Sequence, residues 1–278
     1  MNKFFFVLYG VVFTLLLIAT PFDLELSLSM FKGLNGFSRI ISEMVYIPPF
    51  FIGFFGINYY IFRFSHKKVP LIFRGLIYVL AIIGYLGLSY MFVRSMRFLP
   101  FYLTLAPFFI IGMIIGSFYA SRYVYRNKWF EFDYLASIGM GLIVFLYFVV
   151  TQLKRLFGRA RPYIVIDDES LFTEWYEIAG MVFHRDFYSI PSGHVTFVSI
   201  ALWFILVTLV LPQINIKTWK VTLPVLFWIA LQSYFRICLG EHYITDVLFS
   251  ILFTAFFMHV LYYLSKYIRQ FLTHHFGI

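Results

Sequence analysis

The stretch MGLIVFLYFVVTQLKRLFGRARP, residues 140–162, decides the fold class of this chain. It begins as an apolar run and then places four cations within eight residues: Lys154, Arg155, Arg159 and Arg161. A bilayer core about 30 Å thick is crossed by about 20 apolar residues in a helix. The apolar run over 134–153 has this length. We therefore predict a transmembrane helix that ends at a charged membrane surface.

Apolar runs of similar length recur along the chain. They give eight predicted spans: 4–20, 42–62, 71–93, 101–121, 134–153, 194–211, 218–236 and 243–265. The composition agrees, because 62% of the residues are hydrophobic and 13% are charged, whereas soluble domains carry about 25% charged residues. The fold class is predicted as all-α, a polytopic transmembrane helical bundle of about eight spans. The first run lacks a small-x-small cleavage site, so we expect a retained span rather than a signal peptide.

The formal charge of +9 has to be interpreted in this membrane context. In a soluble protein it would suggest nucleic acid, but here the cations lie between apolar runs. Membrane topology and an anionic ligand explain them better, and no nucleic-acid partner is expected. If the cations at 154–161 and Arg236 are set aside as functional, the remaining charges follow the positive-inside rule with the N-terminus inside. The polar segments at 154–162, 191–194 and 236–246 then face the outer side of the membrane.

The first polar cluster runs from Lys154 to Arg161 and Pro162. A spacing of seven residues is about two helical turns, so we expect both cations on one face of a helix. Pro162 should end that helix. An arginine fork and a lysine ammonium together suit a phosphate group. The alternative is a basic cluster that binds lipid headgroups, and we assign Arg155 and Arg159 to that alternative.

The second cluster is Pro191-Ser192-Gly193-His194, directly before an apolar run. Ser192 is a plausible helix N-cap, and Gly193 lets the backbone approach a ligand closely. The first N–H groups of a helix attract anions, and His194 could stand beside such an anion as a proton donor. The alternative is an ordinary capped helix with a surface histidine.

The third cluster is Arg236, His242 and Asp246. His242 and Asp246 lie four residues apart and would share a helix face. A carboxylate at one ring nitrogen fixes the tautomer and leaves the other nitrogen as a nucleophile. Gly240 is expected to break the preceding span. The alternative is a structural His–Asp pair with an interfacial arginine.

In this order, the three clusters resemble the signature of the type 2 phosphatidic acid phosphatase superfamily, which includes the vanadium haloperoxidases. Its pattern is Lys-x6-Arg-Pro, then Pro-Ser-Gly-His, then Ser-Arg-x5-His-x3-Asp. The match is complete except at Phe235, which replaces the serine. The motifs cover 154–246, and none lies in 1–133. Five spans precede the second motif where the family core has three, so two spans are additional.

The resemblance implies a catalytic core at 134–278, after an N-terminal transmembrane region at 1–133. It implies His242 as the nucleophile that forms a phosphohistidine, Asp246 as its orienting partner, and His194 as the acid. The implied phosphate-binding residues are Lys154, Arg161, Ser192, Gly193 and Arg236. No metal or other cofactor is expected, because side-chain cations supply the positive charge.

The leading interpretation is a phosphatase for a lipid phosphate, with the membrane as its surroundings. Candidate substrates are an isoprenoid diphosphate, phosphatidic acid, phosphatidylglycerol phosphate or a lipid A type glycolipid. A lipid phosphotransferase would use the same phosphohistidine, and a non-enzymatic anion channel is a remote alternative. The expected location is a bacterial inner membrane with the active site on the outer side, and the oligomeric state stays open. Glu43 and Asn58 are expected to face the bundle interior without an assigned role, and Glu241 to tune the nucleophile.

Overall fold

The computed structural model describes residues 2–33, 36–65, 70–97, 102–129 and 131–276. In this part of the chain the regular structure is helical, with no strand. Eight helical stretches are long and apolar enough to cross a membrane: Lys3–Met30, Arg39–Phe64, Leu71–Met96, Tyr102–Arg126, Phe132–Val165, Gly193–Val210, Trp219–Cys238 and Ile244–Ile268. The predicted all-α fold with eight spans is therefore confirmed, and the chain is an integral multi-pass membrane protein.

The chain forms two compact units. One comprises Met1–Val45 and Val144–Val260, and the other comprises Tyr46–Ile143 and Leu261–Ile278. Helices α7 (Phe132–Phe157) and α12 (Ile244–Phe276) contribute to both. These packing units differ from the division at 133, which stays a prediction about function.

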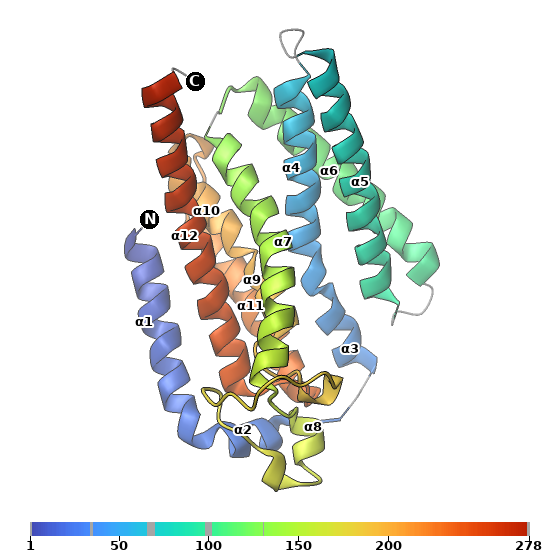
Figure 1. Cartoon of the computed structure of the whole chain (residues 1–278), viewed down its shortest axis with the longest axis vertical. Helices are drawn as coiled ribbons and strands as arrows, with labels where there is room; N and C mark the ends of the chain where they lie inside the picture. Colours follow the sequence, from blue (N-terminus) through green and yellow to red (C-terminus); the bar gives the residue numbers. More distant parts are fainter. Residues whose placement is uncertain (1, 34–35, 66–69, 98–101, 130, 277–278) are drawn as a thin grey trace. The chain divides into compact units, whose positions relative to one another are not determined.

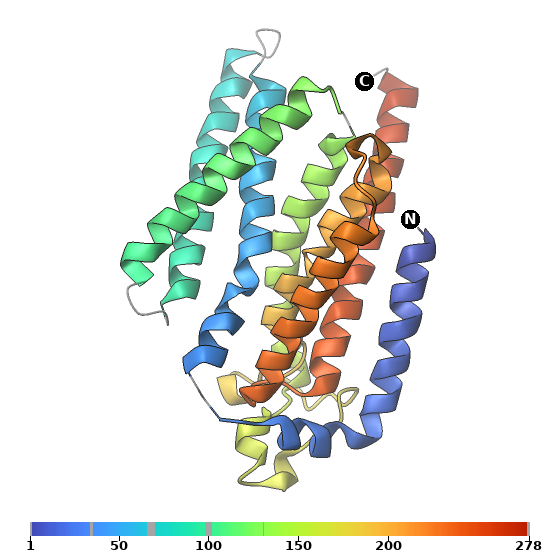
Figure 2. The same cartoon turned by 180° about the vertical axis from the view of Figure 1, so that it is seen from behind.

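The second unit is built around α4 (Ile47–Phe64), which packs against α5 (Leu71–Met96) and α6 (Tyr102–Arg126) (Figure 2). Its interior is mostly aromatic and aliphatic. Asn58 is buried there; its amide nitrogen donates to Ser117 Oγ at 2.9 Å, and its oxygen accepts from Tyr85. The expectation that Asn58 faces the helix interior is confirmed.

The first unit holds all three polar motifs. Its helices are α1 (Asn2–Ala19), α2 (Asp23–Met30), α3 (Gly36–Glu43), α8 (Pro162–Val165), α9 (Gly193–Ser199), α10 (Leu202–Val210) and α11 (Trp219–Cys238), with parts of α7 and α12. Helix α11 packs against α2, α3, α9 and α10. Helices α2 and α8 and the long 158–192 segment lie at one end of this unit (Figure 1). The motifs are positioned at that end.

The end of α7 differs from the sequence-based expectation. The helix stops at Phe157, because Gly158 takes a left-handed φ of +57° and closes the last turn through its N–H to Lys154 O at 3.1 Å. Arg161 is extended, with φ −80° and ψ 148°, and precedes α8. The prediction that Lys154 and Arg161 share one helix face is therefore wrong. Two different elements bring these cations to the site.

Candidate active site

His242 lies in the short connection between α11 and α12. Gly240 makes this connection possible, because its φ of +66° belongs to the left-handed region. A Cβ there would lie 2.7 Å from the Phe31 ring. The backbone is tied further by Tyr163 N, which donates to Gly240 O at 3.0 Å. The predicted break of the span at Gly240 is confirmed, and it places the His242 side chain in a buried position, 1% exposed.

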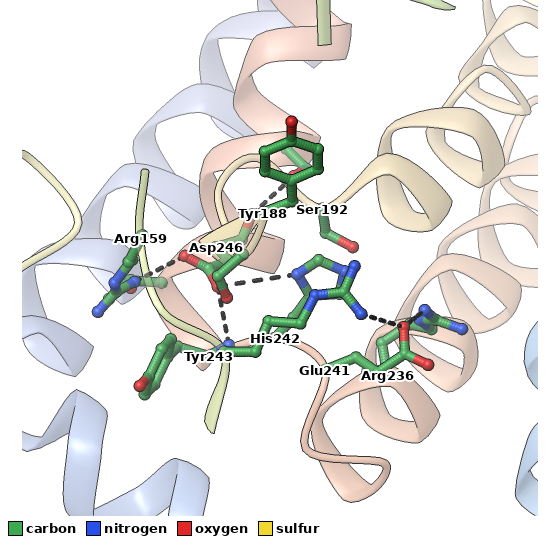
Figure 3. A network of polar contacts seen from close by, with 12 residues as sticks. Arg159, Tyr188, Ser192, Arg236, Glu241, His242, Tyr243 and Asp246 are labelled. Atoms are coloured by element: carbon green, nitrogen blue, oxygen red, sulfur yellow. Dashed lines mark hydrogen bonds and ion pairs between the residues drawn. The ribbon is translucent and has the colours of Figure 1, made fainter. Parts of the chain in front are cut away.

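Asp246 lies beside His242, in the first turn of α12 (Figure 3). Its Oδ2 is 3.8 Å from His242 Nδ1, which is longer than a hydrogen bond. The same oxygen accepts hydrogen bonds from Ser189 Oγ at 2.5 Å and from the Tyr243 N–H at 2.9 Å. The carboxylate is thus fixed on several sides, with one oxygen turned toward the imidazole.

Arg159 holds the other oxygen of Asp246. Its guanidinium is fully buried and donates to Asp246 Oδ1 at 2.6 Å and to Asp23 Oδ2 at 2.8 Å. The Tyr243 ring lies 4.0 Å from the guanidinium carbon, which allows a cation–π contact. The expectation that Arg159 faces lipid headgroups is therefore wrong. It is buried because two carboxylates, both distant in sequence, compensate its charge.

Asp23 brings the N-terminal region into this network. It begins α2, is 1% exposed, and accepts from the Thr245 backbone N–H at 3.0 Å and from the Thr245 hydroxyl at 2.5 Å. The Asp23 carboxylate therefore satisfies donors in the first turn of α12, the helix that carries Asp246. Sequence reasoning did not find this residue. An acidic residue directly after an apolar run was the available signal.

Three cations surround the imidazole of His242. Lys154 Nζ donates to Tyr188 O at 2.7 Å, and Arg161 and Arg236 both contact the Glu241 carboxylate. Burial lowers the pKa of His242 well below its ordinary value, and the charges of Lys154, Arg236 and Arg161 lower it further, against the opposing effect of Asp246. His242 is consequently neutral at neutral pH, with its lone pair available.

Glu241 bridges the two arginines through one oxygen. Its Oε2 is 3.3 Å from Arg161 Nη1 and also contacts Arg236 Nη2. Figure 3 shows Glu241 and Arg236 on the side of His242 opposite Asp246. The Arg161 and Glu241 side chains are 20% and 22% exposed, whereas Arg236 is 2% exposed. The two arginines therefore present an anion site that is open on one side, and a carboxylate of the chain occupies it.

The Pro-Ser-Gly-His turn begins α9. Ser192 is its N-cap, and its Oγ accepts from the Val195 N–H at 3.4 Å, so the predicted cap is confirmed. At Gly193 an added Cβ would lie 3.6 Å from Lys154 Cε, an ordinary contact, so the turn lies directly against Lys154. His194 Nε2 lies 3.5 Å from Glu43 Oε1. All eight residues predicted for the site thus lie in the first unit. They contact one another or share a neighbouring residue, as Arg161 and Arg236 share Glu241.

Glu43 is a second residue of this site that sequence reasoning left without a role. It ends α3, and its side chain is 9% exposed. Its Oε1 approaches Arg236 Nη1 at 3.9 Å as well as His194. The expectation that Glu43 faces the bundle interior is confirmed, and the charged residues facing it are those of the motifs.

No group of three or more His, Cys, Asp or Glu side chains is placed to hold a metal ion within the described ranges. The positive charge near His242 is that of Lys154, Arg161 and Arg236. The expectation that no cofactor is required stays a prediction.

Comparison with known proteins gives one family. The family model described as the PAP2 superfamily matches residues 130–270, half of the 278-residue chain. Neither the curated proteins nor the solved structures contain a match. The matched range contains all three motifs, the His242–Asp246 pair and Arg159, while Asp23 and Glu43 lie ahead of it. The family match and the ordered motifs together identify the chain as a member of the PAP2 superfamily, the type 2 phosphatidic acid phosphatases.

Proposed function

We propose that this chain is a membrane-bound phosphatase that removes phosphate from a lipid phosphate through a phosphohistidine at His242. The main observation in support of this proposal is the environment of His242. Its imidazole is buried with a fixed carboxylate 3.8 Å from Nδ1, and burial and three neighbouring cations lower its pKa. This combination suits attack on a phosphate dianion, because the cations neutralise the electrophile and the nucleophile stays unprotonated.

In the first half-reaction, the lone pair of His242 forms an N–P bond and the P–O bond to the lipid breaks. The leaving oxygen takes the bonding electrons and receives a proton from a ring N–H of His194. Asp246 stabilises the positive charge that develops on the imidazole of His242. Lys154, Arg161 and Arg236 neutralise the phosphoryl oxygens in the transition state, where positioning and charge carry most of the catalysis.

In the second half-reaction, His194 removes a proton from water and the water oxygen attacks phosphorus. The N–P bond breaks, its electrons return to the imidazole, and inorganic phosphate leaves. The Glu241 carboxylate must leave the two arginines for phosphate to enter. Its partial exposure, 22%, gives it room to do so.

The substrate is an amphiphile, because the site lies at one end of transmembrane helices and exposes part of Arg161 there. We place this end at the outer face of a bacterial inner membrane, in agreement with the distribution of the remaining cations. The phosphate would then enter from the headgroup layer while the lipid chains stay among the helices.

The test is phosphate release by purified protein in detergent with a chelator present. Phosphatidic acid, phosphatidylglycerol phosphate, an isoprenoid diphosphate and a phosphorylated glycolipid form the panel, with His242→Ala as the control. We expect release from at least one lipid by the wild type and none by the variant. Labelled phosphate that appears in a second lipid instead of in solution would indicate a phosphotransferase. Release that is equal in His242→Ala would refute the mechanism.

A further inference from the structure

His194 has a carboxylate beside it, as His242 has. Glu43 Oε1 is 3.5 Å from His194 Nε2, and Asp246 Oδ2 is 3.8 Å from His242 Nδ1. Glu43 comes from α3, ahead of the family-matched range 130–270. Its side chain is nearly buried, at 9%, so the attraction between the carboxylate and a charged imidazole is only weakly screened by water.

The position of Glu43 is fixed by its surroundings. Helix α3 packs against α11, which carries Arg236. Arg236 Nη1 donates to Ser42 Oγ at 3.4 Å and lies 3.9 Å from Glu43 Oε1. The last turn of α3 is therefore held against the same arginine that faces the phosphate site, and this contact places the carboxylate next to His194.

We propose that Glu43 is a positioning residue for His194, which it orients and stabilises in the protonated form that donates a proton to the leaving oxygen. This inference rests on the proposed phosphatase function. A carboxylate beside an imidazole favours imidazolium and fixes the ring, and here it acts against the opposing charges of Arg236 on α11 and Lys154 on α7. In the step concerned, the P–O electron pair passes to the leaving oxygen and the proton of His194 follows it. His194 becomes neutral and is then the base that the water step needs.

A second possibility on the same contacts is that Glu43 acts only through Arg236 and phosphate binding. Esters with different leaving groups distinguish these two roles of Glu43. An alkyl alcohol leaves as a strong base and needs the proton of His194, whereas a nitrophenolate leaves without protonation. A residue that serves His194 affects the first class of ester selectively. A residue that serves Arg236, or only the fold, affects both classes alike.

The experiment measures kcat/KM of the full-length protein in detergent with the wild type's best lipid monophosphate and with p-nitrophenyl phosphate. The variants are Glu43→Gln, Glu43→Asp and His194→Asn. Glu25→Gln, an exposed carboxylate on α2, is the matched control. For Glu43→Gln we expect a loss of about 100-fold on the lipid and less than about 3-fold on the nitrophenyl ester, the pattern of a lost general acid.

His194→Asn should show the same selectivity, Glu43→Asp should recover part of the lipid rate, and Glu25→Gln should behave as the wild type. Equal losses of Glu43→Gln on both esters, or no loss on either, would overturn the inference. If Glu43→Gln does not fold, the same comparison on Glu43→Asp decides. A wild type that releases phosphate from neither ester would overturn the proposed function, and with it this inference, so the two failures are distinguishable.

Discussion

Replacing Arg159 with methionine removes the charge that connects the segment directly after α7 to α2 and α12. The methionine keeps most of the apolar volume of the side chain, so the loss is electrostatic rather than a cavity. Asp23 and Asp246 both lose their guanidinium contacts, at 2.8 and 2.6 Å, and both carboxylates are fully buried in the wild type. Removal of one partner from a buried ion pair costs about 3–5 kcal/mol. Because two carboxylates lose their partner, the loss in free energy of unfolding should lie at the upper end of this range, about 4–5 kcal/mol.

Arg155→Met is the matched control, because Arg155 lies in the last turn of α7, four residues before Arg159. Its guanidinium lies 5.5 Å from the Phe183 ring, and the loss of that contact costs about 0.5–1 kcal/mol. The double variant Arg159→Met with Asp23→Asn removes one stranded charge and should regain about 1–3 kcal/mol.

The assay is equilibrium unfolding in mixed micelles of dodecylmaltoside and SDS, followed by tryptophan fluorescence. Arg159→Met is expected to unfold at a much lower SDS fraction than Arg155→Met. If the two variants differ by less than about 1 kcal/mol, the network does not stabilise the fold as a buried ion pair should, and the reasoning is refuted.

Two further predictions concern the connection that carries His242. Burial and the neighbouring cations lower the pKa of His242, so the neutral form should persist to lower pH than in a free histidine. In NMR of histidine-labelled protein, the signal that is missing from His242→Ala should titrate with a midpoint below about 6.5. A midpoint near or above that value would contradict this prediction. Gly240→Ala combines a φ of +66° with a Cβ 2.7 Å from the Phe31 ring, so it should cost about 1–3 kcal/mol and reduce phosphate release. Gly10→Ala, where an added Cβ meets nothing within 4 Å, should leave both unchanged, and equal behaviour of the two variants would argue against the role of Gly240.

The sequence was sufficient for the spans and for the motif residues, for different physical reasons. A membrane span is a local property, because about 20 apolar residues must occur consecutively. The residues at 154–246 could be found because their chemical types and spacing are complementary. The end of α7 was misjudged because a left-handed glycine stops a helix earlier than the next proline does.

The contacts that fix these residues could not be read from the sequence. Arg159 and Asp23 are 136 residues apart, and nothing local distinguishes a buried arginine from the headgroup-facing cations beside it. Glu43 was recognised as an acidic residue inside a span, yet its neighbour His194 belongs to a different helix. Asp23 and Glu43 both precede the motifs, in a region where residue spacing gave no chemical signal.

The most direct test of the central claim is to trap the phosphoenzyme. Wild-type protein is mixed with a ³²P-labelled lipid phosphate that it hydrolyses, quenched with alkali during turnover, and digested for peptide mapping. A phosphohistidine is stable in alkali and labile in acid, so label with this behaviour should map to the peptide that contains His242. His242→Ala should carry none. With ³²P-labelled p-nitrophenyl phosphate, whose leaving group needs no proton, His194→Asn should accumulate more label than the wild type because its water step lacks a base. Turnover without bound label, together with an active His242→Ala variant, would contradict the account.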